Sequence, residues 1–144
     1  MKSLRWISLG LVASVGIGVT QQDPWYREVA QLLANDAAQF RDEGLSLSQD
    51  IIWGALDDGE ARRSVVKLQG QVTYVIIGEC DTDCEDLDLE LFQGTRKLSS
   101  DLAADDVPIL IFTPQVTGVF TIRVIMASCS ADPCRYGVGL FEES

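Results

Sequence analysis

The second half of the chain consists of short segments in which apolar residues recur at every second position. The clearest is residues 86–92, where three leucines alternate with acidic residues. Because successive side chains of a β-strand point to opposite faces, this alternation predicts leucines in a core and Asp86, Asp88 and Glu90 in water. Further strands are expected at residues 62–69, 71–77, 95–98, 107–112, 116–126 and 136–141. Six or seven short strands with no helix between them predict a mainly β protein, an antiparallel β-sandwich.

One α-helix is expected before these strands, over residues 23–40. Apolar residues recur there at spacings of three, four and seven, which is typical of a helix with one apolar face. Asp23 suits the N-cap and Pro24 the first helical position, while Gly44 is a plausible stop. Residues 45–59 are interpreted as a connector that leads into the first strand.

The N-terminus has the pattern of a secretory signal. Lys2 and Arg5 precede an uncharged, largely apolar stretch at residues 6–19, which ends in small residues. An uncleaved N-terminal anchor is the alternative, although the stretch is shorter than the roughly 20 apolar residues of a membrane span. We therefore expect a periplasmic or secreted protein with no stable membrane span after signal removal. The predicted divisions are a signal peptide at 1–20, helix and connector at 21–59, and a sandwich at 60–144.

The expected export bears on the four cysteines, Cys80, Cys84, Cys129 and Cys134. An even number in an oxidising compartment predicts two disulfides, and four cysteines allow three pairings that spacing alone does not distinguish. We favour the local pairs, because each lies in a polar segment between two expected strands. A four-thiolate zinc site is the alternative, which the spacing barely permits and which export disfavours.

Charge and composition exclude several function classes. The net charge of −11 argues against nucleic acid as a partner. The chain has no histidine, which excludes Ser-His-Asp and Cys-His catalysis and histidine-ligated zinc. It also has no Gly-x-Ser-x-Gly elbow and no glycine-rich phosphate loop before a helix. We expect no enzyme activity, with a hydrolase that uses only carboxylates as the alternative.

The acidic segment around the first cysteine pair is a candidate calcium site. Asp81, Asp83, Glu85 and Asp86 follow a predicted strand, and calcium prefers such hard oxygen ligands. The segment is not an EF-hand, because Asp86 stands where that loop requires glycine and Phe92 where it requires glutamate. The alternative is a solvated acidic rim that keeps an exported protein soluble. No other cofactor is indicated.

Two tryptophans and one tyrosine between residues 21 and 59 are candidate ligand contacts. Trp25 and Tyr26 begin the helix, and Trp53 lies in the connector. Such rings bind sugars or peptides when they line a groove. We favour the other interpretation, in which they cover the open end of the core, because large aromatic side chains are usually mostly buried.

Several short motifs resemble those of bacterial pre-peptidase C-terminal (PPC) domains. Asp86-Leu87-Asp88-Leu89, with Leu91 and Phe92, is similar to the aspartate-leucine strand of that family, and residues 118–124 to a later strand. Gly54-Ala55-Leu56, with Gly59, resembles the approach to its first strand. The resemblance implies a jelly-roll-like β-sandwich, generally non-catalytic, whose relatives bind collagen or polysaccharide, some with calcium. The chain departs from that pattern in its cysteine pairs and its helix, and we expect no attached enzyme.

We therefore expect an exported, non-catalytic binding or accessory module with an unknown protein or polysaccharide ligand. It would act at the cell envelope or outside the cell. The alternative is a calcium-dependent carbohydrate- or matrix-binding module.

Overall fold

The computed structural model describes residues 23–144, so the predicted signal peptide lies outside the described residues. One helix, α1 (Pro24–Asp42), precedes nine strands. The strands are β1 (Leu45–Leu47), β2 (Ile52–Leu56), β3 (Ala61–Leu68), β4 (Tyr74–Cys80), β5 (Cys84–Gln93), β6 (Arg96–Asp101), β7 (Ile109–Phe112), β8 (Gly118–Cys129) and β9 (Cys134–Glu143).

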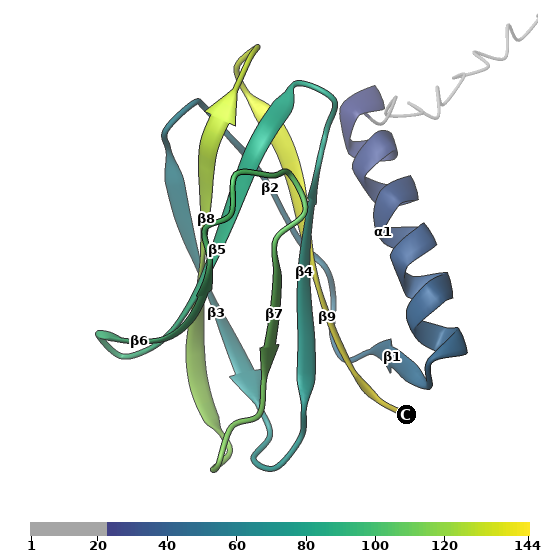
Figure 1. The fold of residues 1–144 in the computed structure, drawn as a ribbon, viewed down its shortest axis with the longest axis vertical. Coiled ribbons are helices and arrows are strands. Elements are labelled where there is room, and N and C mark those ends of the chain that lie inside the picture. The colour runs from purple at the N-terminus through teal and green to yellow at the C-terminus, as the bar shows by residue number, and fades with distance from the viewer. Residues whose placement is uncertain (1–22) are drawn as a thin grey trace, which may run out of the picture.

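The strands form two antiparallel sheets packed face to face (Figure 1). The five-stranded sheet has the order β1-β9-β4-β7, with β2 also paired to β9, and the four-stranded sheet has the order β3-β8-β5-β6. From β2 to β9 each strand lies in the other sheet from the one before it, in the manner of a jelly roll, except that β5 and β6 are neighbours in the same sheet. This confirms the predicted antiparallel sandwich with one N-terminal helix.

The main core lies between the two sheets. Leu87, Leu89 and Leu91 of β5 are fully buried there, as their alternation predicted. From the five-stranded sheet, Tyr136 and Leu140 of β9 reach the same core. The inward side chains of both sheets are thus apolar, and their burial is the largest favourable contribution to the free energy of folding.

The connector expected at residues 45–59 contains two strands, β1 and β2. Both pair with β9, and Trp53 lies opposite Gly137 in that register. The sequence signal was weak because β1 has only three residues and β2 includes a glycine. The segment is therefore one edge of the five-stranded sheet.

The exposure to water predicted for Glu90 is wrong. Its side chain points away from the core leucines but is buried, because Arg123 and Lys97 close over it. Arg123 Nη1 donates to Glu90 Oε2 at 2.8 Å. Although burial opposes ionisation, these two cations hold the pKa of Glu90 below its ordinary value.

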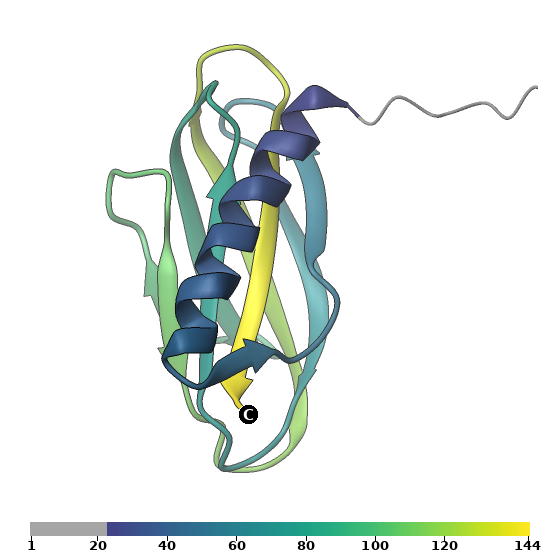
Figure 2. The same ribbon diagram turned by 90° about the vertical axis from the view of Figure 1, so that its right-hand side faces the viewer.

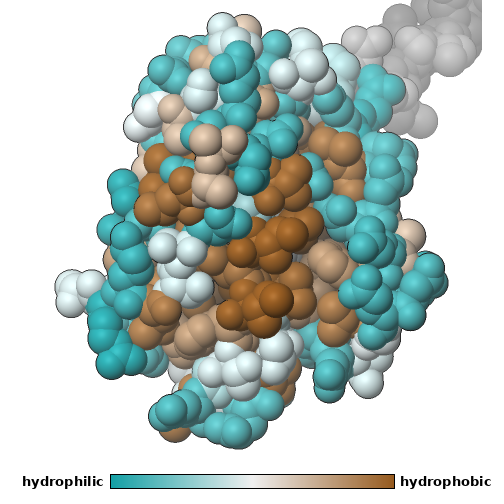
Figure 3. All heavy atoms as spheres, in the orientation of Figure 1, coloured by the Kyte–Doolittle hydropathy of each residue, from teal (hydrophilic) through white to brown (hydrophobic). Residues whose placement is uncertain are grey.

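Apolar side chains gather near the middle of the surface shown in Figure 3, over the edge strand β7. Ile109 and Ile111 of that strand are exposed. The free edge is partly blocked, because the Ile109 N–H donates to Asp101 Oδ2 at 2.9 Å. A carboxylate bound to an edge strand, with Pro108 and Pro114 on either side, discourages the addition of another strand.

Helix α1 lies along the outer face of the five-stranded sheet (Figure 2). Asp23 caps it, accepting from the Trp25 N–H at 3.0 Å, and Gly44 follows its end with φ = +85°. The buried residues Val29 and Leu33 pack against Ile77 and Phe141, which form a second apolar cluster. The five-stranded sheet is consequently buried on both faces, and the molecule has three layers.

Glycines in β9 allow this close approach of the helix. A Cβ atom at Gly137 would lie 2.6 Å from Leu33 Cδ1 and 3.0 Å from Trp53 Cζ3. At Gly139 it would lie 2.8 Å from Phe141 Cε2. Real Cβ atoms essentially never approach other atoms this closely, so both positions favour glycine where the helix docks.

We predict that Gly137→Ala lowers the free energy of unfolding by about 1–3 kcal/mol, because the new methyl group overlaps Leu33. Combining it with Leu33→Ala should cost less than the sum of the two single changes, since the smaller side chain makes room. Urea denaturation measures both effects. Gly118→Ala is the matched control, because its Cβ would meet nothing closer than Gln93 Nε2 at 3.4 Å. Equal losses for the two glycine variants would contradict the docking geometry.

Candidate functional site

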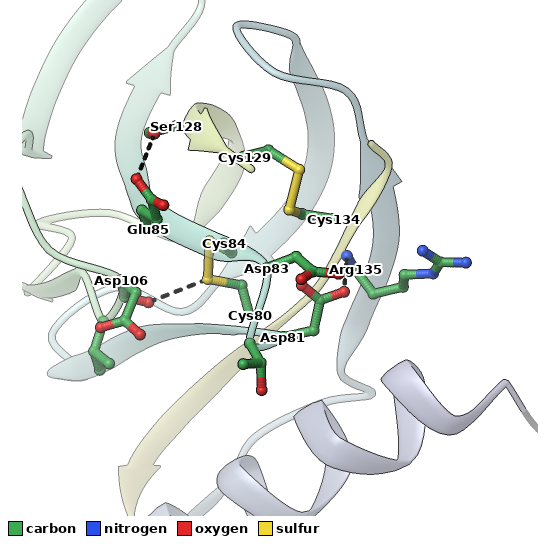
Figure 4. The surroundings of a disulfide bond; sticks show 12 residues. Cys80, Asp81, Asp83, Cys84, Glu85, Asp106, Ser128, Cys129, Cys134 and Arg135 are labelled. Atoms are coloured by element: carbon green, nitrogen blue, oxygen red, sulfur yellow. Dashed lines mark hydrogen bonds between the residues drawn. A yellow bond between two sulfur atoms is a disulfide. The ribbon is translucent and has the colours of Figure 1, made fainter. Parts of the chain in front are cut away.

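Two disulfides brace neighbouring loops at one end of the sandwich (Figure 4). Cys80–Cys84 joins the end of β4 to the start of β5, and Cys129–Cys134 joins β8 to β9. The Cα–Cα distances of 5.9 and 6.0 Å are ordinary for such bonds. The predicted local pairing is therefore confirmed, and it leaves no thiolate for the zinc alternative.

The four residues of the predicted calcium site do not converge. Asp81 is buried, and its Oδ2 accepts the Arg135 N–H at 2.8 Å, whereas Glu85 turns toward Ser128 (Figure 4). Asp83 lies near Asp81. Asp86 is further along β5, where burial and then the charge of Asp105 raise its pKa. Within residues 23–144, no group of three or more acidic or cysteine side chains is arranged to hold a metal. Calcium binding by this segment stays a prediction.

Arg135 connects the acidic loop to the helix. Its backbone N–H binds Asp81, and its guanidinium Nη2 and Nε lie 2.8 and 2.9 Å from Asp23 Oδ2. A third guanidinium nitrogen, Nη1, donates to the Pro133 carbonyl at 2.6 Å. Because Asp23 also caps α1, this one arginine fixes the start of the helix beside β9. This role of Arg135 was not predicted from the sequence, where its only signal is a lone arginine just after a cysteine in an acidic chain.

A groove of about 350 Å³ lies beside this ion pair, between α1 and β2. Its lining consists of Asp23, Tyr26, Arg27, Ala30 and Trp53. The two aromatic rings meet edge to face, with centroids 6.1 Å apart and planes at 83°. The structure thus brings together a helix residue and a connector residue that are far apart in sequence.

Trp53 has two roles in this arrangement. One side of its indole packs over Gly137 of β9, as a covering residue would. The side chain nevertheless keeps 42% of its surface exposed, and that surface faces the groove. Packing on one side holds the ring in place, so the exposed side is a preorganised contact surface.

The chemistry of the lining suits binding. Asp23 is the only acid among the lining residues, and its carboxylate is already bonded to Arg135. Glycoside hydrolysis needs two carboxyl groups that face each other across the substrate. The rings can instead contact an apolar face of a ligand, while Arg27 and the ion pair offer polar contacts at the rim.

A pair of acids lies beneath the helix, away from the groove. Glu79 of β4 is buried, and burial followed by the charges of Asp36 and Asp106 raises its pKa to about 8. Burial also raises the pKa of Asp36 on α1. The pair therefore retains a proton at neutral pH, which avoids two adjacent buried charges.

We predict that the protein loses stability as the pH rises from about 4.5, the ordinary value for glutamate, to about 8. A buried acid with a raised pKa binds its proton more tightly in the folded state, so it favours folding only while protonated. Glu79→Gln should flatten this slope in thermal melts. The control is Glu143→Gln at the exposed end of β9. An unchanged slope in the Glu79 variant would contradict the assignment.

Among residues 23–144, no helix is both long and apolar enough to cross a membrane. Comparison with family models and with curated proteins finds no match for this chain.

Proposed function

We propose that this chain is an exported, non-catalytic β-sandwich module that binds a polysaccharide or a protein ligand. It would serve as a binding or accessory module at the cell envelope or outside the cell. The groove between α1 and β2 is the proposed ligand site.

One observation carries this proposal: Trp53 and Tyr26 line a concave site, and Trp53 is held in place by its packing over Gly137 and by its edge-to-face contact with Tyr26. Concave sites lined by aromatic side chains with a few polar groups are the usual places where ligands bind. Exposed tryptophan and tyrosine residues are also enriched among the side chains that dominate binding energy. A groove of this composition favours recognition of a partly apolar ligand surface, such as a sugar ring or a peptide side chain.

Four further features support export and the lack of chemistry. The two disulfides are typical of proteins in oxidising compartments, and the N-terminal sequence has the pattern of a secretory signal. The chain has no histidine, so a common general base is missing. The resemblance of residues 86–92 to PPC domains points the same way, since those domains are generally non-catalytic.

The test is a binding screen of the full protein on a glycan array and on proteins from its own envelope or culture fraction. We expect at least one retained ligand, and Trp53→Ala should weaken its binding by about tenfold through loss of an aromatic contact. Trp25→Ala is the matched control, because Trp25 has a similar exposed fraction of 37% but does not line the groove. Running the screen with calcium and with EDTA tests the calcium-dependent alternative.

Two results would contradict the proposal. One is equal weakening by the Trp25 and Trp53 variants, which would place the ligand elsewhere. The other is turnover of generic hydrolase substrates by the purified protein.

A further inference from the structure

The outer face of the four-stranded sheet carries opposite charges at its two ends. Helix α1 packs on β9, β4 and β1 of the other sheet, on the far side of the sandwich (Figure 1). The outward residues of β3, β8 and β5 are set by the cross-strand register. Arg63 lies opposite Arg123, which lies opposite Glu90, and one row further along Ala61, Ile125 and Asp88 are aligned.

The cationic end of this face comprises Arg63, Lys67, Lys97 and Arg123. Arg63 and Arg123 are direct cross-strand neighbours, a placement that is unfavourable for like charges. Glu90 is the one carboxylate among them and already binds both Arg123 and Lys97. Arg63 instead lies over the Phe92 ring, 4.9 Å from its centroid. This end therefore holds an excess of positive charge on a chain whose net charge is −11.

The acidic end comprises Asp86 and Asp88, further along β5. Each has one buried carboxylate oxygen with no hydrogen-bond partner among the described residues. Neither takes part in the ion pairs formed within residues 23–144. Burial, followed by the charge of neighbouring acids, raises the pKa of both groups. These carboxylates thus lack the cations that the other end has in excess.

Aliphatic side chains lie between the charges. Val65 and Val119, at the cationic end, are 72% and 61% exposed. They are diagonal neighbours on β3 and β8, since Val65 is opposite Thr121 and Val119 is opposite Lys67. Ile125 lies beside Asp88 at the acidic end. Each end therefore offers aliphatic surface as well as charge.

We propose that this face binds a second copy of the chain. A twofold axis in the plane of contact would set the cationic end of each copy against the acidic end of the other, so that one surface is complementary to itself. The long-range repulsion between two acidic chains is largely screened at physiological salt, where the Debye length is about 8 Å, while direct contacts persist. The α1–β2 groove is on the opposite side, so the pair would present two ligand sites facing outward.

A charge-swap experiment tests the contact by sedimentation velocity over a range of protein concentrations. Arg63→Glu with Lys67→Glu reverses the cationic end, and Asp86→Lys with Asp88→Lys reverses the acidic end. Each double variant alone should associate at least about tenfold more weakly than the wild type, because like charges meet at both ends. An equimolar mixture should recover association, because the two reversed ends meet each other and the two unchanged ends meet each other.

A second pair of variants decides the question if a charge-reversed protein does not fold, as judged by near-UV circular dichroism. Val65→Ser should weaken association, whereas Val116→Ser, at an equally exposed valine (75%) outside this face, should not. A wild type that stays monomeric at all concentrations overturns the proposal. So does a mixture of folded variants that fails to associate, or an equal effect of the two valine changes.

Discussion

The packing of α1 onto the glycines of β9 is the contact on which the rest of the structure depends. Leu33 occupies space that a side chain at Gly137 would fill, and this lets the helix lie directly on the sheet. The contact buries the second face of the five-stranded sheet, where Ile77 and Phe141 would otherwise meet water. It also forms the groove, because one wall of that groove is the helix and the other is Trp53.

Several acidic side chains stabilise loops and the helix start by accepting hydrogen bonds from backbone N–H groups, in addition to keeping the surface charged. Asp58 accepts the Cys129 N–H, Asp81 accepts the Arg135 N–H, and Asp23 caps the helix. Carboxylates that accept backbone N–H groups in loops stabilise those loops, so these acids have a structural role of their own. Two of the few cations also have structural roles: Arg135 holds the start of α1 through Asp23, and Arg123 neutralises the buried Glu90. An acidic composition alone therefore does not indicate a metal site.

Much of the fold could be predicted because its strongest signals are local. The alternation in residues 86–92 and the helical spacing in residues 23–40 depend only on the periods of a strand and a helix. Strand β1 could not be found in this way, because its three residues are too few to show an alternation. Its strand conformation depends on pairing with β9, which is far away in the sequence. The burial of Glu90 was missed because its cations come from other strands. The groove was missed for the same reason, since it depends on where α1 docks.

The central claim is that α1 is an integral layer of the domain, and native-state hydrogen exchange tests it most directly. The buried stretch of α1 around Val29 and Leu33 should exchange its amides with nearly the same opening free energy as the paired amides of β4 and β9. That result requires the helix and the sheet to unfold together. Rapid exchange throughout α1 while both strands stay protected would contradict the account, because the helix would then detach without disturbing the sandwich.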